Sequence, residues 1–271
     1  MFKDKKVLVT GANGMIGRSL VKMLTTRGAV VTTTDLPTDL RNRDACAQVC
    51  EGQNFVFHLA GIKGSPQRCM QAPASFSVPM IQFNANMVEA AYNAGVEWYL
   101  YTSSVGVYHP AEVFYEDSVW ETFPSKNDWF AGWAKRIGEM NVEAYMKEYN
   151  WPQCSIVRPA NVYGPHDNFG QWSMVVPSLI KKAMENEVLE VWGDGSPIRD
   201  LIYTDDVAAG MIHAVENKIT EPLNLGSGTG ITIREVAEII AQHFDREIQW
   251  DTTKPMGDRK RLMSMERAAN H

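Results

Sequence analysis

Hydrophobic residues in this chain form short runs separated by longer segments of helical periodicity. Val7–Val9 is the first run, too brief for a helix and typical of a buried parallel strand. Met15–Arg27 follows, with its apolar residues on one side at helical spacing. Further strand-like runs occur at Ala29–Thr34, Phe55–Leu59 and Trp98–Thr102. This alternation predicts an α/β fold with a Rossmann-type doubly wound parallel sheet.

The same patterns continue to the end of the chain. Thr204 is the expected cap of one later helix, and Thr232 with Glu235 forms a capping box that starts another. The segments Ile62–Pro79 and His109–Asp128 are broken by proline and are expected to be loops. We predict helices over Asp44–Cys50, Met80–Ala94, Gly132–Tyr149, Val175–Met184, Thr204–Glu216 and Thr232–Phe244, and strands over Ser155–Arg158, Val188–Trp192, Leu223–Leu225 and Ile248–Asp251.

The alternation of strands and helices changes near Gly164. We therefore expect the chain to divide into two parts at this position. Residues 1–164 form the cofactor-binding domain, and residues 165–271 form mainly a smaller C-terminal substrate-binding lobe. We expect some of the later segments to return and pack on the first domain.

Three glycines follow the first strand at a spacing of three residues. Gly11 allows a tight turn, Gly14 lets the backbone approach a pyrophosphate, and Gly17 lets helix and strand pack closely. The amino end of the following helix offers free N–H groups and partial positive charge to an anion. A strand, a glycine turn and a helix in this order predict dinucleotide binding.

Asp35 ends the second strand, at the distance from the glycines expected of a ribose-binding carboxylate. Because this carboxylate would repel a 2′-phosphate, we expect NAD rather than NADP as the cofactor. Arg18, Arg41 and Arg43 lie close enough in sequence to weaken that preference.

Composition narrows the classes of function. The chain has 271 residues, 45% of them hydrophobic, and a net charge of −6 with no basic block, which argues against nucleic acid or an anionic membrane as partner. No apolar run approaches the ~18 residues that span a bilayer, and Met1–Lys6 leads directly into the first strand without a signal peptide. The four cysteines show no metal-binding CxxC pair. We therefore expect a cytoplasmic enzyme without a metal.

Several motifs in order resemble the extended short-chain dehydrogenases/reductases, which include nucleotide-sugar epimerases, dehydratases and reductases. The motifs are GANGMIG, Asp35, HLAG at residues 58–61, TSS at 102–104, the helix of Lys135, RPANVYGP at 158–165 and GDGSPIRD at 193–200. Residues 163–169, Trp192-Gly193, Ser196-Pro197, Arg199 and the KP pair at 254–255 are most similar to the GDP-fucose synthase branch. The resemblance covers nearly the whole chain.

The resemblance implies which residues surround NAD. These are Gly11, Asn13, Gly14, Met15, Ile16, Gly17, Asp35, Asp39, Leu40, Leu59, Ala60, Gly61, Ser103, Lys135, Pro159 and Val162.

In the family a Ser, a Tyr and a Lys act together in catalysis. Ser104 matches the Ser, with Ser103 as the weaker candidate, and Lys135 matches the Lys. The alternative for Lys135 is a solvated helix lysine, and the surrounding motif favours the catalytic role. The Tyr belongs four residues before Lys135 on the same helix face, where this chain has Ala131. There are three explanations. An inactivating substitution replaced the tyrosine, or another acid acts in its place, or the protein has lost the redox step and only binds its ligands. Candidates for another acid are Tyr108, Tyr115 and Lys135.

Other absent residues restrict the reaction that the resemblance implies. Family dehydratases carry an Asp-Glu pair where this chain has Val105-Gly106. GDP-fucose synthases use a Cys and a His where Val105 and Met174 stand here. Without such proton-transferring pairs, the remaining chemistry is hydride transfer at C4 of the sugar, by a 4-epimerase or a 4-ketoreductase.

The expected substrate-binding residues are Ser104, Asn161, Met174, Arg199, Arg259 and Arg261. The resemblance places Asn161 and Arg199 near the diphosphate, although Arg199 is alternatively a surface partner of Asp200. Spacing does not decide between Arg259 and Arg261. His58 is interpreted as a structural residue, and His166 either lines the sugar site or lies on the surface.

Two functional hypotheses remain open. The first is an NAD-dependent nucleotide-sugar 4-epimerase or 4-ketoreductase of a cell-surface-polysaccharide pathway, and the second is a catalytically silent protein that binds NAD and a sugar nucleotide. The resemblance also implies a homodimer built from the helices at Met80–Ala94 and Gly132–Tyr149. Family chains continue past position 271, so we expect the C-terminal lobe to be incomplete.

Overall fold

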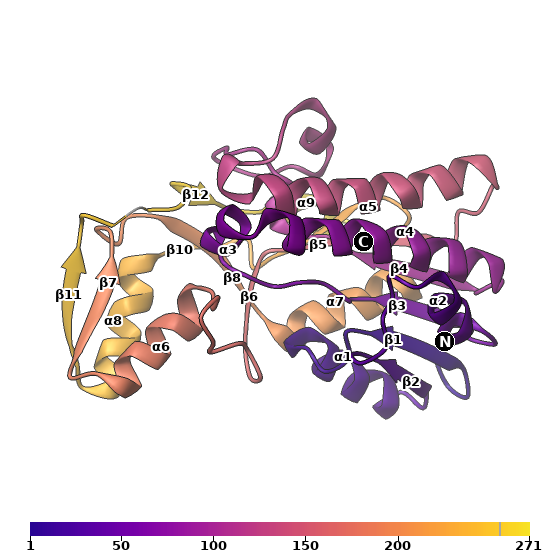
Figure 1. Cartoon of the computed structure of the whole chain (residues 1–271), viewed down its shortest axis with the longest axis horizontal. Coiled ribbons are helices and arrows are strands. Elements are labelled where there is room, and N and C mark those ends of the chain that lie inside the picture. Colours follow the sequence, from indigo (N-terminus) through magenta and orange to yellow (C-terminus); the bar gives the residue numbers. More distant parts are fainter. Residues whose placement is uncertain (255) are drawn as a thin grey trace.

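A computed structural model describes residues 1–254 and 256–271, with only the backbone described at Pro66. Its centre is a six-stranded sheet (Figure 1), in which every neighbouring pair of strands is parallel. The strands lie in the order β2 (Val30–Thr34), β1 (Lys6–Thr10), β3 (Phe55–His58), β4 (Trp98–Thr102), β5 (Cys154–Pro159) and β9 (Leu223–Leu225). The predicted α/β fold with a Rossmann-type parallel sheet is confirmed.

Helices cover both faces of this sheet because each crossover between parallel strands runs over one face or the other. On one face α1 (Met15–Thr26) packs against α7 (Thr204–Glu216), and on the other α4 (Pro73–Asn93) packs against α2 (Arg43–Cys50) and α5 (Trp129–Glu148). The strands are buried on both sides. The sheet therefore separates two hydrophobic cores.

The second part of the chain forms a smaller lobe at the left of Figure 1 and also contributes to the first sheet. A third hydrophobic core lies between its helices and a two-stranded parallel sheet. The lobe contains α6 (Val175–Glu185), α8 (Ile233–Phe244), β7 (Val188–Trp192) and β11 (Glu247–Asp251). A mixed sheet adjoins the lobe, made of β6 (Asn161–Tyr163), β8 (Ile198–Tyr203), β10 (Gly230–Thr232) and β12 (Lys260–Arg261). Between β8 and β10 the chain returns to the large sheet through α7 and β9, and the short α9 (Glu266–Ala269) packs near β9.

The helices and strands predicted from periodicity are present, with ends shifted by a few residues. The capping box of Thr232 and Glu235 is formed, and its helix ends at Phe244 as predicted. The predicted cap at Thr204 is wrong, because Tyr203 occupies the cap position and Thr204 is already helical. The buried Thr204 hydroxyl has no hydrogen-bond partner among the described residues.

The predicted loop at Ile62–Pro79 is wrong. This stretch contains α3 (Pro66–Gln71) and the first turns of α4, which begins at Pro73. Proline suits the first position of a helix, because the N–H that it lacks would have no intrahelical partner there. Pro79 lies inside α4. Two prolines of this stretch thus begin helices, and the third does not end the helix that contains it.

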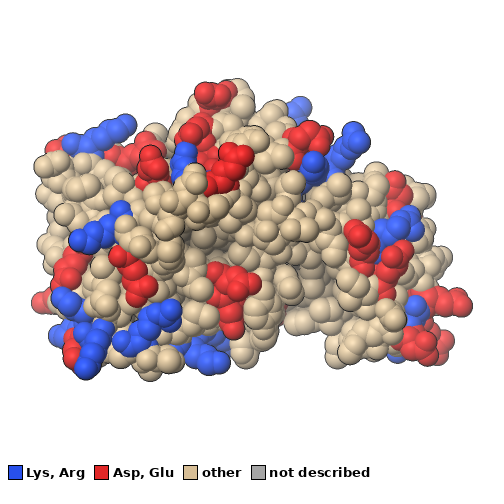
Figure 2. Space-filling view, turned by 180° about the vertical axis from the view of Figure 1, so that it is seen from behind, with Lys and Arg blue, Asp and Glu red and all other residues tan. Residues whose placement is uncertain are grey.

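Charged side chains of both signs are mixed on the face seen in Figure 2, and its hollowed middle is mostly uncharged. Among the described residues, no helix is long and apolar enough to cross a membrane.

Candidate active site

A cavity of about 1090 Å³ opens beyond the carboxyl ends of the central strands. Its walls come from the loops after β1, β3, β4 and β5, and from the smaller lobe at Pro177 and Leu201. The chain runs from β1 outward to β2 and then returns to β3 on the other side of β1. Ligands of open α/β sheets bind at such a reversal of strand order.

The glycine turn shapes one end of this cleft. Gly11 has a positive φ of 67°, and a Cβ at Gly17 would lie 2.3 Å from the carbonyl oxygen of Gly11. Side chains at these positions would therefore strain the turn or separate α1 from β1. Gly14 precedes α1, whose first turn holds no acidic residue. The free N–H groups and positive end of the helix suit a phosphate group.

Asp35 lies beside this turn and lines the cleft. Its Oδ2 accepts the backbone N–H of Asn13 at 2.9 Å, and its Oδ1 accepts the N–H of Leu36 at 2.9 Å. Asn13 does not itself line the cavity, so the structure gives it the role of bracing Asp35.

The other predicted cofactor residues line one continuous wall. They are Gly11, Gly14, Met15, Ile16, Gly17, Asp39, Leu40, Leu59, Ala60, Gly61, Ser103, Lys135, Pro159 and Val162.

A buried polar group fixes the loop after β3. The hydroxyl of Thr10 accepts the N–H groups of Leu59 and Ala60 at 3.1 and 3.0 Å. The two ring nitrogens of His58 contact the Thr10 hydroxyl at 2.8 Å and the Asn84 side-chain oxygen at 3.0 Å. Burial lowers the pKa of His58 to about 3. His58 is therefore a neutral structural residue, as interpreted from the sequence.

Ser104 follows β4 and lines the cleft. Its Oγ accepts the N–H of Gly106 at 3.1 Å, which fixes the side chain. The beginning of α5 lies against this segment, because a Cβ at Gly132 would be 2.4 Å from the Gly106 carbonyl oxygen. Ser103 also lines the cavity, but its hydroxyl is buried and has no partner in the described part of the chain.

Lys135 and Ala131 lie one helical turn apart on α5, and both line the cleft. Lys135 Nζ donates to the Thr102 carbonyl at 2.7 Å and lies 3.7 Å from the position of a Cβ on Gly61. Burial lowers the pKa of Lys135 to about 8. The alternative of a solvated surface lysine is wrong. The geometry brings together the Ser, the Lys and the position of the expected Tyr, and the last is a methyl group.

A family model for the NAD dependent epimerase/dehydratase family matches residues 7–226. The chain belongs to this family. It is 31% identical over 284 residues to GDP-L-fucose synthase 1 of Arabidopsis thaliana, covering 99% of this chain and 87% of that protein. It is 32% identical over 283 residues to a GDP-L-fucose synthase of Sinorhizobium fredii, covering 98% and 89%. A crystal structure of a GDP-L-fucose synthetase from Naegleria fowleri bound to NADP superposes with a TM-score of 0.87 at 26% identity, covering 100% of this chain and 87% of that one.

The two alternative tyrosines do not line the cleft of this family member, whose described lining contains neither. Tyr108 is buried, and its hydroxyl donates to the Asn224 side-chain oxygen at 2.6 Å. Burial raises the pKa of Tyr108 to about 12. Tyr115 is 51% exposed on the surface. Of the three candidates for another acid, only Lys135 lies at the site.

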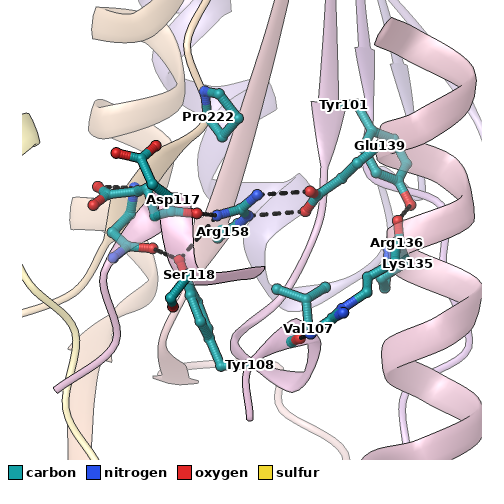
Figure 3. A network of polar contacts seen from close by, with 12 residues as sticks. Tyr101, Val107, Tyr108, Asp117, Ser118, Lys135, Arg136, Glu139, Arg158 and Pro222 are labelled. Carbon is teal, nitrogen blue, oxygen red and sulfur yellow. Dashed lines mark hydrogen bonds and ion pairs between the residues drawn. The ribbon is translucent and has the colours of Figure 1, made fainter. Parts of the chain in front are cut away.

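An ion pair joins Arg158 on β5 to Glu139 on α5 (Figure 3). Arg158 donates from Nε and Nη2 to the two carboxylate oxygens of Glu139 at 3.0 and 2.7 Å. Its Nη1 also donates to the Tyr108 hydroxyl at 3.1 Å and to the Glu116 carbonyl at 2.7 Å. Arg136 donates to the carbonyl of Val107 at 2.9 Å from Nε. These contacts join β5, α5 and the segment after Ser104.

The predicted substrate-binding residues separate into two groups. Asn161, Met174 and Arg261 line the cleft with Ser104, whereas Arg199 and Arg259 are not among its described lining residues. Arg199 instead donates from Nη1 to the carbonyls of Ile198 and Asp258. It does not pair with Asp200, whose carboxylate is buried and accepts N–H groups of Ser227 and Gly228. Arg259 is exposed. Of these two arginines, Arg261 alone is among the described lining residues of the cleft.

Sequence reasoning missed three charged residues of the cleft wall. Lys63 and Asp167 lie on loops of the two parts and form an ion pair of 2.5 Å, and Asp128 lies at the beginning of α5. The position of Lys63 two residues after the HLAG motif was an available signal, and so was the position of Asp128 one turn before Ala131. His166, left undecided from the sequence, also lines the cleft. Among the described residues, no cluster of three or more His, Cys, Asp or Glu side chains is placed to hold a metal ion.

Proposed function

We propose that this protein acts on a nucleotide sugar by hydride transfer at C4 of an NDP-hexose, as a 4-epimerase or a 4-ketoreductase. The observation that supports this proposal is the meeting of Ser104, Lys135 and position 131 at one end of a cleft whose other end is the glycine turn. The relatives are GDP-L-fucose synthases by name, so a GDP-sugar is the first substrate class to test.

The residues fit a bound dinucleotide, because the open glycine turn and the uncapped end of α1 can receive its phosphates. When bound, a nicotinamide ring would accept the hydride that a sugar carbon loses, or supply the hydride that the carbon gains. Ser104 keeps its hydroxyl proton for the reacting sugar oxygen, because its Oγ only accepts from Gly106. Lys135 uses one of its N–H groups on the Thr102 carbonyl and keeps the others for ligands.

Two positions of the cleft wall lack side chains that could transfer a proton at the neighbouring sugar carbons. Val105 and Met174 both line it, at the places where GDP-fucose synthases carry their Cys and His. Neither side chain has a proton that it can exchange with a sugar. This favours chemistry confined to C4 over epimerisation at C3 and C5.

Ala131 leaves the proposed reaction without its general acid and base. A positioned acid or base contributes roughly 10²- to 10⁴-fold to a rate, so we propose that the chain with Ala131 turns over slowly or not at all. The test is Ala131→Tyr, assayed by nicotinamide absorbance over a panel of GDP-, UDP- and dTDP-sugars and their 4-keto forms. We expect turnover to rise by roughly 100-fold or more. Ala144→Tyr, on an exposed position of the same helix, is the matched control.

The methyl group at position 131 also supports a second candidate function. A catalytically silent member of the family would bind NAD and a sugar nucleotide through the same cleft without hydride transfer. Tight cofactor binding by Ala131→Tyr, with no turnover of any sugar in the panel, would favour this second function and would overturn the first.

We propose NAD as the cofactor, although the Naegleria relative is bound to NADP. Asp35 places a carboxylate beside the glycine turn. Two nearby arginines already form salt bridges, because Arg41 makes a bidentate pair with Asp39 and Arg43 pairs with Glu89. A 2′-phosphate would therefore meet a fixed negative charge and few free cations. Isothermal titration with NAD and NADP decides between them.

We also propose that the protein is a homodimer. The helices α4 and α5 form an outer layer over one face of the sheet (Figure 1). Val78 and Met140 on these helices are 47% and 51% exposed, which supports burial of this layer against a second copy. Light scattering measures the mass in solution, and a monomer at micromolar concentration would contradict the dimer.

A further inference from the structure

Asp128 lies at the sugar end of the cleft, one turn before Ala131. It occupies the position just before α5 and lines the cavity. A Cβ at Gly106 would lie 3.6 Å from Ser104 Oγ and 3.7 Å from Asp128 Cγ. The carboxyl group of Asp128 and the hydroxyl of Ser104 therefore flank the same glycine, which has no side chain to separate them.

The two carboxylate oxygens of Asp128 have different surroundings. Oδ2 is buried and forms an ion pair with Nη2 of Arg261. Among the described residues, Oδ1 has no hydrogen-bond donor, although the Asp128 side chain remains 14% exposed where it lines the cleft. One oxygen is thus held by the protein, and the other is available to a ligand in the cleft.

Arg261 is poorly placed to neutralise a diphosphate. Its Nε and Nη2 also donate to Asp258 Oδ2, at 3.0 and 2.5 Å, so Arg261 already pairs with two carboxylates. Arg199 is a second guanidinium close enough to interact with the same two carboxylates. Asp258 is fixed in turn by Ser125 and Asn127. This network holds Asp128 still, and a carboxylate oxygen that has no donor of its own suits a hydroxyl donor of the ligand.

We infer that Asp128 positions the sugar, with Oδ1 accepting a ring hydroxyl next to the reacting carbon. The inference rests on the proposed function, in which Ser104 binds the reacting oxygen itself. It predicts selection for sugars that keep a hydroxyl beside C4, because a deoxy sugar would leave the carboxylate without a donor. Asp128 would therefore contribute to the affinity for the sugar and not to the affinity for the nucleotide.

The experiment compares the affinities for GDP-mannose and GDP by isothermal titration, on the chain with Ala131 so that no turnover interferes. In Asp128→Ala we expect GDP-mannose to bind roughly 10- to 100-fold more weakly, as for a lost hydrogen bond to a charged group, with GDP affinity unchanged. Asp128→Asn keeps the shape and a weaker acceptor, and we expect a smaller loss of roughly 3- to 10-fold. Asp117→Ala removes a carboxylate that pairs with Arg267 on the surface, and should change neither affinity.

The outcomes separate the two proposals. Equal losses for GDP and GDP-mannose in both Asp128 variants, or no loss for either ligand, would overturn the role of Asp128 and leave the proposed function standing. If the unmodified chain binds NAD but neither GDP nor GDP-mannose, nor any UDP- or dTDP-sugar, both proposals fail. Melting curves followed by circular dichroism show that each variant is folded, and Asp128→Asn carries the test if Asp128→Ala is not.

Discussion

Arg158 and Glu139 form a two-point ion pair in which neither side chain is exposed to solvent. Arg158 comes from β5 and Glu139 from α5, so the pair fixes the helix that carries Ala131 and Lys135 to the sheet beneath it. Arg136, which is also buried, lies near the same carboxylate. One acidic residue thus balances two buried guanidinium groups.

Glu139→Gln should be among the most destabilising single changes in this chain. It keeps the shape of the side chain but leaves buried guanidinium charge without a counter-charge, which costs about 3–5 kcal/mol in the free energy of unfolding. Urea denaturation at neutral pH measures the difference. Glu112→Gln is the control, because Glu112 pairs with Lys260 at the surface, where such pairs contribute about 0–1 kcal/mol. Similar losses for the two variants would contradict the prediction.

Acid should destabilise the protein through His58. Its pKa is near 6.5 in the unfolded chain and is lowered to about 3 in the fold by burial. Between these values the unfolded chain binds the extra proton, so stability is lost as the pH falls below about 6.5. The loss reaches about 2 kcal/mol near pH ~5.

His58→Gln tests this prediction, because glutamine offers one donor and one acceptor without a titratable ring. Denaturation curves near neutral pH and near pH ~5 should show a smaller loss for His58→Gln than for the unmodified chain. The control His213→Gln changes an exposed histidine and should follow the unmodified chain. The same loss in all three proteins would exclude His58 as the cause.

Periodicity predicted most of the central fold, because its helices and strands are long or fully buried. Strands Trp98–Thr102 and Leu223–Leu225 agree with the structure residue by residue. The strand Ile198–Tyr203 and its partners Asn161–Tyr163 and Gly230–Thr232 were missed, because the partners have only three residues each and all three strands are only partly buried. The pairing of these partners with β8 depends on contacts far along the chain, which a local pattern does not contain.

Motifs predicted residues that line the cleft, Ser104 and Lys135 among them, because each of these residues follows a strand or faces one side of a helix. They did not place Arg199, whose guanidinium donates to the Asp258 carbonyl instead of facing the cleft. Asp128 was missed although it lies one turn before Ala131, because its ion pair with Arg261 joins segments that are distant in sequence. Contacts between side chains that are far apart in the sequence are therefore the part of the site that could not be predicted.

Asp35 should set the preference for NAD. Asp35→Ser removes the carboxylate that would repel a 2′-phosphate and accept ribose hydroxyls. We expect NAD to bind roughly 10-fold more weakly and the preference over NADP to shrink or reverse. Titration of both cofactors measures the ratio of dissociation constants. Asp44→Ser, in the first turn of α2, is the control. An unchanged ratio in Asp35→Ser would show that another residue selects the cofactor.

Lys135 should make the protein more stable as the pH rises from about 8 to about 10.5. Burial lowers the pKa of Lys135 from 10.5 to about 8 in the fold. Between these values the unfolded chain holds a proton that the folded chain has released, so the free energy of unfolding rises with pH, by about 3 kcal/mol at most.

Lys135→Met removes this contribution. The stability of the unmodified chain relative to Lys135→Met should therefore increase across this pH range. Lys147→Met, at an exposed position of the same helix, should show no such trend. A difference in the free energy of unfolding between the two proteins that stays constant from pH ~7 to ~10.5 would contradict the prediction. It would mean that Lys135 has the same pKa in the fold as in the unfolded chain.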